Sequence, residues 1–131
     1  MLLKSGVKMD DFKINIENLS GIKPGKILFG NITGISNKVI DGMILRLFWF
    51  TQGKGTKDTK TVSEFEFSCG KNEFREDFSI QLPFTPCSFT GKLISLNWAL
   101  ELIIKPTNKS SLYEFILSEN GEIRDLYHEE F

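Results

Sequence analysis

Few residues in this chain of 131 residues combine the types and spacing that catalysis or metal binding requires. The single histidine, His128, stands three residues before the C-terminal end, a weak support for a catalytic triad or a metal cage. Cys69 and Cys87 lack the Cys-x-x-Cys spacing of a zinc site. Both lie near apolar strand ends, so free thiols are expected, the alternative being one disulfide between them. We therefore predict no enzymatic activity, no metal site and no cofactor.

Two further patterns could carry chemistry but have simpler structural explanations. Glu64 and Glu66 share the outward face of a predicted strand, where paired carboxylates can bind a cation or act on a glycoside. Solvated strand faces commonly carry such pairs. The run Gly53-Lys54-Gly55-Thr56 lacks the first glycine and the following helix of a phosphate-binding loop, so a hairpin loop is expected.

That loop could still present a small basic tip. Lys54, Lys57 and Lys60 could bind phosphate, a phosphopeptide or lipid headgroups. Asp58 dilutes the positive charge, and solvated lysines are the simpler interpretation. Lys54 and Lys57 are kept as candidate partner-binding residues.

Composition favours one soluble domain over residues 1–131, with flexible ends at 1–11 and 128–131. Hydrophobic residues make up 40% of the chain and charged residues 25%, and twelve phenylalanines favour strands. The net charge of −1 gives no global field for nucleic acid, so a nucleic-acid partner is not expected. The N-terminus has no apolar run of signal-peptide length, and no stretch is long enough to span a membrane. A cytoplasmic location is predicted.

The clearest strand signal is the alternation at 94–104. Trp98 and its apolar neighbours occupy every second position there, which predicts one buried and one solvated sheet face. Residues 73–82 repeat the pattern, with Glu76 as the one charged residue on the apolar side. Between the two strands, Pro83 and Pro86 cannot continue a hydrogen-bonded ladder, so the chain must turn a corner.

Shorter strands complete the prediction. Phe12, Ile14 and Ile16 alternate with polar residues in a first strand. Further strands are expected at 26–35, 39–52 and 62–69, of which the last two form a hairpin. Turns are expected at 36–38 and 70–72, a loop at 105–111, and a closing hairpin of 112–118 with 122–127 around Asn120-Gly121. Many short strands and no helical periodicity predict an all-β, two-sheet antiparallel sandwich.

Residues 39–52 are apolar on both faces. Met43, Leu45, Leu47 and Trp49 alternate with Ile44, Phe48 and Phe50. Either a second layer covers both faces, or the surplus aromatic side chains form a contact surface. Phe48 and Phe50 are therefore candidate binding residues.

Three stretches in order resemble the arrestin-like family. They are Ile22-Lys23-Pro24-Gly25 followed by a strand to Ile32, the strand Met43 to Phe50 leading into a glycine-rich loop, and the corner 82–91 before the strand with Trp98 and Glu101. The resemblance implies an immunoglobulin-like sandwich in which the corner residues are architectural, with Trp98 in the core. These corner residues are Leu82, Pro83, Pro86, Ser88, Phe89 and Gly91.

Arrestin-like proteins are non-enzymatic adaptors, which implies a protein partner for this chain. Family members usually carry two tandem sandwiches, and this chain has room for one, so it is more similar to stand-alone bacterial arrestin-like proteins. The leading hypothesis is binding through a sheet edge, at Phe12–Ile16 or the closing hairpin, or through loops. Self-pairing along such an edge would give a homodimer. The alternative is a small-molecule or carbohydrate-binding sandwich that uses Trp49, Phe48 or Phe50.

Overall fold

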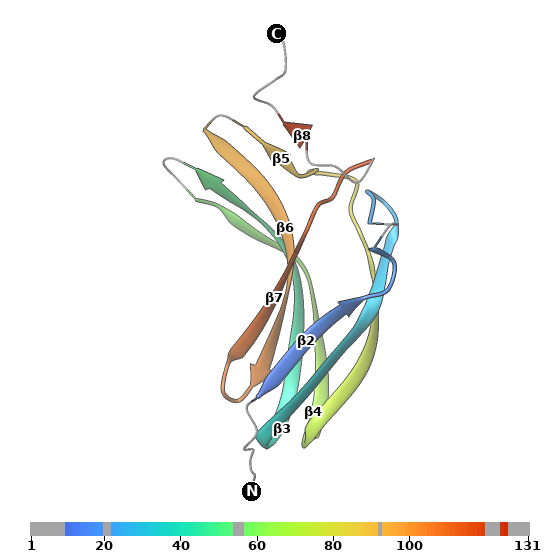
Figure 1. The fold of residues 1–131 in the computed structure, drawn as a ribbon, viewed down its shortest axis with the longest axis vertical. Helices are drawn as coiled ribbons and strands as arrows, with labels where there is room; N and C mark the ends of the chain where they lie inside the picture. Colours follow the sequence, from blue (N-terminus) through green and yellow to red (C-terminus); the bar gives the residue numbers. More distant parts are fainter. Residues whose placement is uncertain (1–9, 20–21, 54–56, 92, 120–123, 126–131) are drawn as a thin grey trace, which may run out of the picture.

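The protein is a single bent β-sheet that folds over on itself (Figure 1). The computed structural model describes residues 10–19, 22–53, 57–91, 93–119 and 124–125. The strands are β2 (Asp11–Ile16), β3 (Ile27–Gly53), β4 (Thr59–Gln81), β5 (Phe89–Thr90), β6 (Ile94–Lys105), β7 (Lys109–Phe115) and β8 (Arg124–Asp125). Within these ranges Leu19 is the one residue in a helical turn, and no helix is long and apolar enough to cross a membrane.

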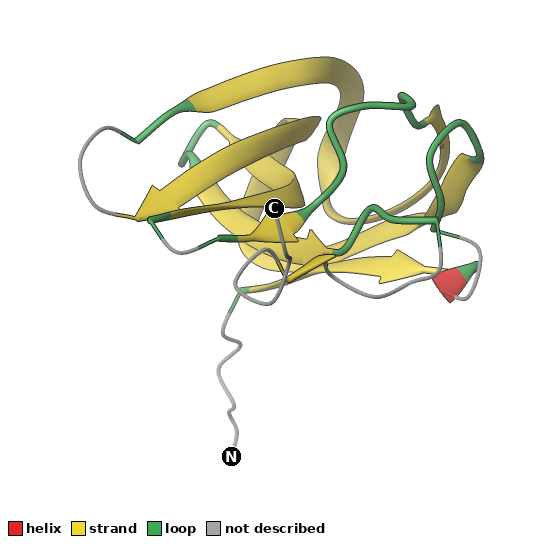
Figure 2. Cartoon of the chain, turned by 90° about the horizontal axis from the view of Figure 1, so that it is seen from above, coloured by secondary structure: helices red, strands yellow, loops and turns green. Residues whose placement is uncertain are grey.

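The two layers of the sandwich share strands β3 and β4. The first part of β3 pairs with β2 on one side and with the end of β4 on the other, from Ile27↔Gln81 to Ile35↔Glu73. The second part of β3 pairs with β6 and with the beginning of β4. Seen from above, the strands curl around a common interior (Figure 2). The predicted all-β, two-sheet antiparallel sandwich is confirmed, with one short parallel pair, β5 with β8.

The turns predicted at 36–38 and 70–72 do not end the strands, because β3 and β4 continue through both positions and fold over there (Figure 1). The β3–β4 register shifts between Ile35 and Gly42, and Gly70 has a positive φ of 80°, a conformation that glycine adopts without a Cβ penalty. Asn72 Nδ2 donates to Ser36 O across the two bends at 3.4 Å. Turn-forming residues here fold a continuous pair of strands over, so that the two parts of the pair belong to the two layers.

The core lies between the two layers and is built from the inward residues of the strands. Its fully buried members come from both parts of β3, from β4 and from β6, and they include Leu28, Ile32, Met43, Leu45, Leu47, Ile80, Trp98, Leu100 and Leu102. Trp98 is 0% exposed, its indole Nε1 donates to Pro86 O at 2.7 Å, and its ring centroid lies 6.4 Å from that of Phe115. The alternation predicted for 94–104 is therefore confirmed from Leu96 to Ile104, whereas Ile94 is 37% exposed.

The proline corner links the layers through backbone hydrogen bonds. Leu82 N donates to Lys26 O at 2.9 Å, which continues the β3–β4 ladder to the corner. Ser88 is 1% exposed; its N donates to Leu117 O at 2.9 Å, and its Oγ accepts from Leu117 N at 3.0 Å. Because those bonds pair a buried hydroxyl with buried backbone groups, this serine holds the segment after β7 against the corner.

The other corner residues differ in burial. Leu82 is 1% exposed, Pro83 and Pro86 are half-buried, and Phe89 is half-buried against the core. Gly91 N donates to Ile94 O at 2.9 Å. Phe84 is 72% exposed, so this aromatic lies outside the core.

The predicted closing hairpin is wrong. Residues 106–108 form a tight turn, with Asn108 at φ 65°, and β7 returns antiparallel along β6 from Lys109. Arg124–Asp125 pair with β5 in parallel, instead of with 112–118. Asn120 and Gly121 lie outside the described residues. The loop predicted at 105–111 is shorter than expected, because β6 and β7 extend into it.

Asp10 connects the start of β2 to the β6–β7 turn. Its carboxylate accepts from Lys109 Nζ at 2.5 Å and from Asn37 N at 3.2 Å. The hydrogen bond from Lys109 holds the pKa of Asp10 below its ordinary value of 3.8, against an opposing effect of desolvation. The ionised carboxylate therefore links three segments that are distant in sequence.

Trp98→Ala should lower the free energy of unfolding by roughly 3–5 kcal/mol, because the substitution leaves a cavity and removes the donor to Pro86 O. Urea denaturation followed by circular dichroism measures the change. Phe84→Ala is the matched aromatic control, and its effect should stay within about 0.5 kcal/mol because Phe84 is mostly exposed. Equal effects of the two substitutions would contradict the assignment of Trp98 to the core.

Asp10→Asn should lower the melting temperature at pH 6 and have a smaller effect at pH 3. A carboxyl group whose pKa is lowered in the folded state stabilises it above the unfolded pKa. That contribution is lost as the pH falls below 3.8 and through the lowered folded-state pKa of Asp10. Thermal melts of both proteins at the two pH values test this, and a difference that is larger at pH 3 would contradict it.

Candidate functional site

The outer face of the second layer carries two adjacent aromatic side chains. Met43, Leu45 and Leu47 of β3 point into the core at 1% exposure or less, so the alternate residues Ile44, Phe48 and Phe50 point outward. Phe48 and Phe50 are half-buried, and their ring centroids are 5.8 Å apart with the planes tilted by 39°. Trp49, between them, packs against the core instead.

Neighbouring strands extend this outer surface. Phe48 is paired with Ala99 of β6 and Ile44 with Ile103. Ala99 is 0% exposed although it points outward, so the side chains around it cover it completely. On β7, Tyr113 and Phe115 face the core, whereas Leu112 before them and Ile116 after them remain 53% and 38% exposed. The aromatic face is defined by Ile44, Phe48, Phe50, Ala99, Ile103, Leu112 and Ile116.

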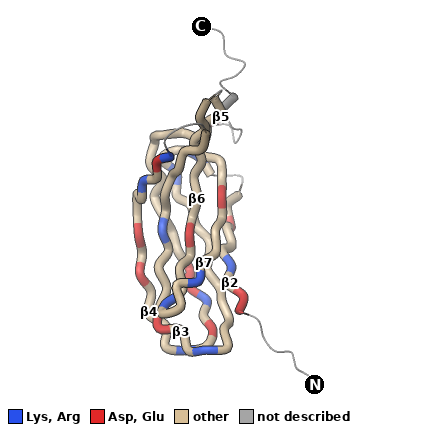
Figure 3. Tube along the Cα trace, turned by 90° about the vertical axis from the view of Figure 1, so that its left-hand side faces the viewer, with Lys and Arg blue, Asp and Glu red and all other residues tan. Residues whose placement is uncertain are grey.

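Acidic residues surround the aromatic face. Arg46, at its centre, forms ion pairs with Glu64 at 2.9 Å and with Glu101 at 3.2 Å. Glu66 is opposite Ile44 and Glu114 is opposite Ala99. These four carboxylates outnumber the one guanidinium among them, although acidic and basic residues mix along the strands as a whole (Figure 3).

The strand predicted as the recognition edge is directed inward. Phe12, Ile14 and Ile16 of β2 pack against the core, and Phe12 stacks on Phe74 with ring centroids 6.4 Å apart and planes 9° apart. Gly34 lies between the two rings: a Cβ there would approach Phe12 Cδ1 to 2.7 Å. A glycine is required at this position because the aromatic pair occupies the space of its side chain.

The free side of β2 is also partly covered. Ser111 Oγ of β7 donates to Phe12 O at 2.9 Å, and β7 lies beside β2 in Figure 1. A strand that added to β2 would have to displace this contact. Recognition through Phe12, Ile14 and Ile16 stays a prediction, and the geometry favours it less than recognition through the aromatic face.

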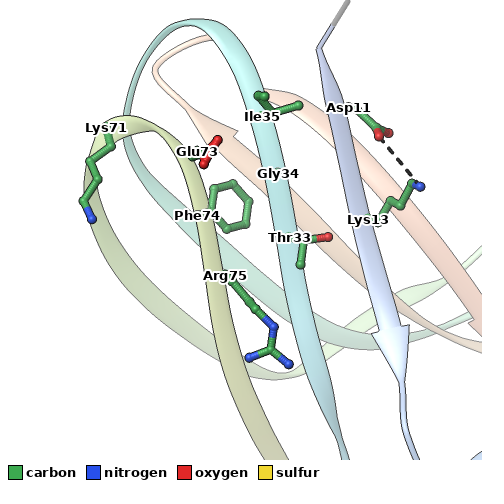
Figure 4. Close-up of a pocket in the computed structure, with 9 residues that line it drawn as sticks. All are labelled: Asp11, Lys13, Thr33, Gly34, Ile35, Lys71, Glu73, Phe74 and Arg75. Carbon is green, nitrogen blue, oxygen red and sulfur yellow. Dashed lines mark ion pairs between the residues drawn. The ribbon is translucent and has the colours of Figure 1, made fainter.

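The first layer carries a charged, open depression of ≈ 520 Å³ on its outer face. Figure 4 shows Asp11 and Lys13 of β2 on one side of it, and Lys71, Glu73 and Arg75 of β4 on the other. A second depression of ≈ 450 Å³ is lined by Phe29, Arg75 and Asp77 among others. Neither depression includes Trp49, Phe48 or Phe50, the residues expected to bind a small ligand.

The remaining predicted residues are not brought to a common site. Lys57 is exposed before β4, next to Asp58, whose N–H donates to Thr51 Oγ1 at 2.9 Å. Lys54 and His128 lie outside the described residues. Cys69 of β4 and Cys87 of the corner are free thiols. Across the described ranges, no group of three or more histidine, cysteine, aspartate or glutamate side chains could hold a metal ion.

Sequence reasoning found Phe48 and Phe50 but missed the residues that complete their surface. Leu112 and Ile116 were expected in a closing hairpin, and Ile103 was regarded only as part of a strand. It also missed the alternating charges Lys71, Glu73, Arg75 and Asp77, which are visible in the sequence. These charges could take part in strand pairing only if β4 lies at the edge of the sheet, and the tertiary structure decides that.

Comparison with known proteins identifies the fold. No family model matches the chain, and no curated protein matches it. Among solved structures, Spo0M, a sporulation control protein from Bacillus subtilis, superposes with a TM-score of 0.55 over 86% of this chain, at 18% sequence identity. The chain spans about half of the Spo0M chain, because the match covers 50% of it. The likeness shows an arrestin-like sandwich fold and does not show membership of a family.

Arg46→Gln should lower the free energy of unfolding by about 1 kcal/mol or less, because two half-exposed ion pairs are lost and Glu64 and Glu101 remain near each other. Added salt should reduce the difference between the two proteins by screening the charges. Urea denaturation at low and high ionic strength measures both effects. A cost that does not change with salt would show that Arg46 acts through packing of its side chain.

Proposed function

We propose that this chain is a non-catalytic, cytoplasmic protein-interaction module that binds a basic amphipathic segment of a partner on its aromatic face. The observation that supports this most directly is the pair Phe48 and Phe50, half-exposed side by side on a sheet surface. Aromatic residues in such positions are common anchors of protein interfaces.

The chemistry of the partner follows from the surroundings of that pair. Leu112 and Ile116 extend the apolar surface, so the partner should present at least two apolar or aromatic side chains to it. Glu66 and Glu114 lie on either side, and their carboxylates favour Lys or Arg beside those apolar residues. An acidic segment of the same hydrophobicity would be repelled.

The shape of the site supports a protein partner over a small ligand. Phe48 and Phe50 project from neighbouring outward positions of one strand, whereas both depressions described above lie on the first layer. Small ligands are usually bound in concave pockets with convergent polar groups, while sheet surfaces with exposed aromatics suit extended protein contacts.

A regulatory role is part of the proposal. The superposed protein, Spo0M, is described as a sporulation control protein. By analogy of fold alone, the present chain would act by binding and not by catalysis. Its specific partner has to be found by experiment.

Selection from a random peptide display library tests the proposal. The wild-type protein should enrich peptides with two or more apolar residues flanked by Lys or Arg. The double variant Phe48→Thr/Phe50→Thr keeps β-forming residues on β3 and should bind these peptides at least tenfold more weakly, the size expected when interface anchors are removed.

Phe29→Thr is the matched control, since Phe29 is 42% exposed on the outer face of the first layer. It should bind the selected peptides as the wild type does. Melting temperatures establish that all proteins are folded. Peptides without basic residues, or equal binding by the double variant, would contradict the proposal, and acidic versions of the selected peptides should fail to bind.

A further inference from the structure

Strand β4 forms one long edge of the molecule. It extends over 23 residues, and within the described residues its only strand partner is β3. Its register with β3 is regular from Glu73 to Gln81. One side of this segment therefore carries backbone N–H and C=O groups without a strand partner, which is the template for edge-to-edge pairing.

The hydrogen bonds between β3 and β4 indicate which backbone groups of β4 are available. Leu82 N donates to Lys26 O, so residue 82 points its backbone groups toward β3. In a regular antiparallel ladder this direction alternates along the strand. The N–H and C=O groups of Glu73, Arg75 and Asp77 consequently point away from β3, toward solvent.

The side chains on the outer face of the same segment alternate in charge. Lys71, Glu73, Arg75 and Asp77 are all exposed, and the first three line one side of the depression in Figure 4. Within the described part of the chain, the side chains of Lys71 and Glu73 have no ion-pair partner. Arg75 pairs with Asp77 along the strand at 3.1 Å, with both side chains more than 60% exposed.

We propose that two copies of this chain pair antiparallel through β4, with the twofold axis at Phe74. In this register Glu73 of each copy lies opposite Arg75 of the other, and Lys71 lies opposite Asp77. Every outward charge of the segment then meets an opposite charge, and directly opposite ion pairs stabilise adjacent strands. On the inner side, Glu76 would lie opposite Asn72, whose amide can donate to its carboxylate.

Neighbouring registers are excluded by the same charges. With the axis at Glu73, Lys71 would face Arg75 and Glu73 would face its own copy. With the axis at Arg75, Glu73 would face Asp77 and Arg75 would face its own copy. Like charges directly opposite each other are destabilising, so the two adjacent registers are disfavoured, and the axis at Phe74 is the register that pairs all four charges from Lys71 to Asp77. It also disfavours pairing with a strand that carries charge of one sign.

Phe74 would form an apolar contact between the two copies at the twofold axis. It is half-buried against the core and stacks with Phe12, and in the dimer it would meet Phe74 of the second copy. The inward direction of Phe74 places this contact on the side of the sheet that faces the interior. The interface is distinct from the aromatic face, so the dimer does not depend on the proposed partner site.

Charge reversal of the purified full chain tests the dimer. In Lys71→Glu/Arg75→Glu all four outward residues become acidic, and in Glu73→Lys/Asp77→Lys all four become basic. Sedimentation velocity under reducing conditions should show a wild-type dimer that dissociates as salt is added. Each variant alone should sediment as a monomer at low salt, and an equimolar mixture of the two should restore the dimer.

Lys13→Glu/Lys26→Glu is the matched control for Lys71→Glu/Arg75→Glu, because it makes the same change in net charge at exposed positions outside β4. It should remain dimeric, as should Phe48→Thr/Phe50→Thr. The proposal is overturned if the wild type is monomeric at every concentration reached at low salt. It is equally overturned if either charge variant alone remains a dimer, or if their mixture stays monomeric.

Discussion

The continuity of β3 and β4 through both layers is the constraint on which the rest of this structure depends. A strand of 27 residues that pairs with β2, β4 and β6 must bend, because its two parts belong to different layers. The bend is possible where the register shifts near Ile40 and where Gly70 adopts a positive φ. Since both parts of β3 contribute buried residues, the bend also closes the core. The fold is therefore one sheet, and the bent hairpin formed by β3 and β4 folds it into a two-layer sandwich.

This arrangement decides which surfaces are available for binding. β2 and β7 approach each other through Ser111 and Phe12, which protects that side of the molecule. Among the described residues β4 pairs only with β3, so it lies at the edge of the sheet and carries exposed charged side chains from Lys71 to Asp77. The second layer exposes Phe48 and Phe50, because no third layer covers β3 on its outer side within the described residues. Both proposals use surfaces that the bent hairpin leaves uncovered.

The fold class was predictable from local patterns, while the connections were not. The alternation around Trp98 correctly gave the buried face of β6, and the pairing of 39–52 with 62–69 was correct because a polar loop directly connects these two segments. The turns assigned to Ser36 and to Gly70 were wrong as strand ends, because glycine and polar residues can also fold a paired strand over without ending it. The closing hairpin failed because Arg124–Asp125 found a partner in β5, distant in sequence.

The residues of the candidate site also divide into those whose direction the sequence predicts and those that only the tertiary structure brings together. The sequence by itself determined that Phe48 and Phe50 alternate with core residues, that Trp98 is inward, and that Glu73, Arg75 and Asp77 share one side of a strand, because side-chain direction in a strand repeats every two residues. Only the tertiary structure decided that Leu112 and Ile116 join the aromatic pair, that β2 is partly covered, and that β4 is an edge. Those outcomes depend on backbone pairing between distant segments, which the period of two does not encode.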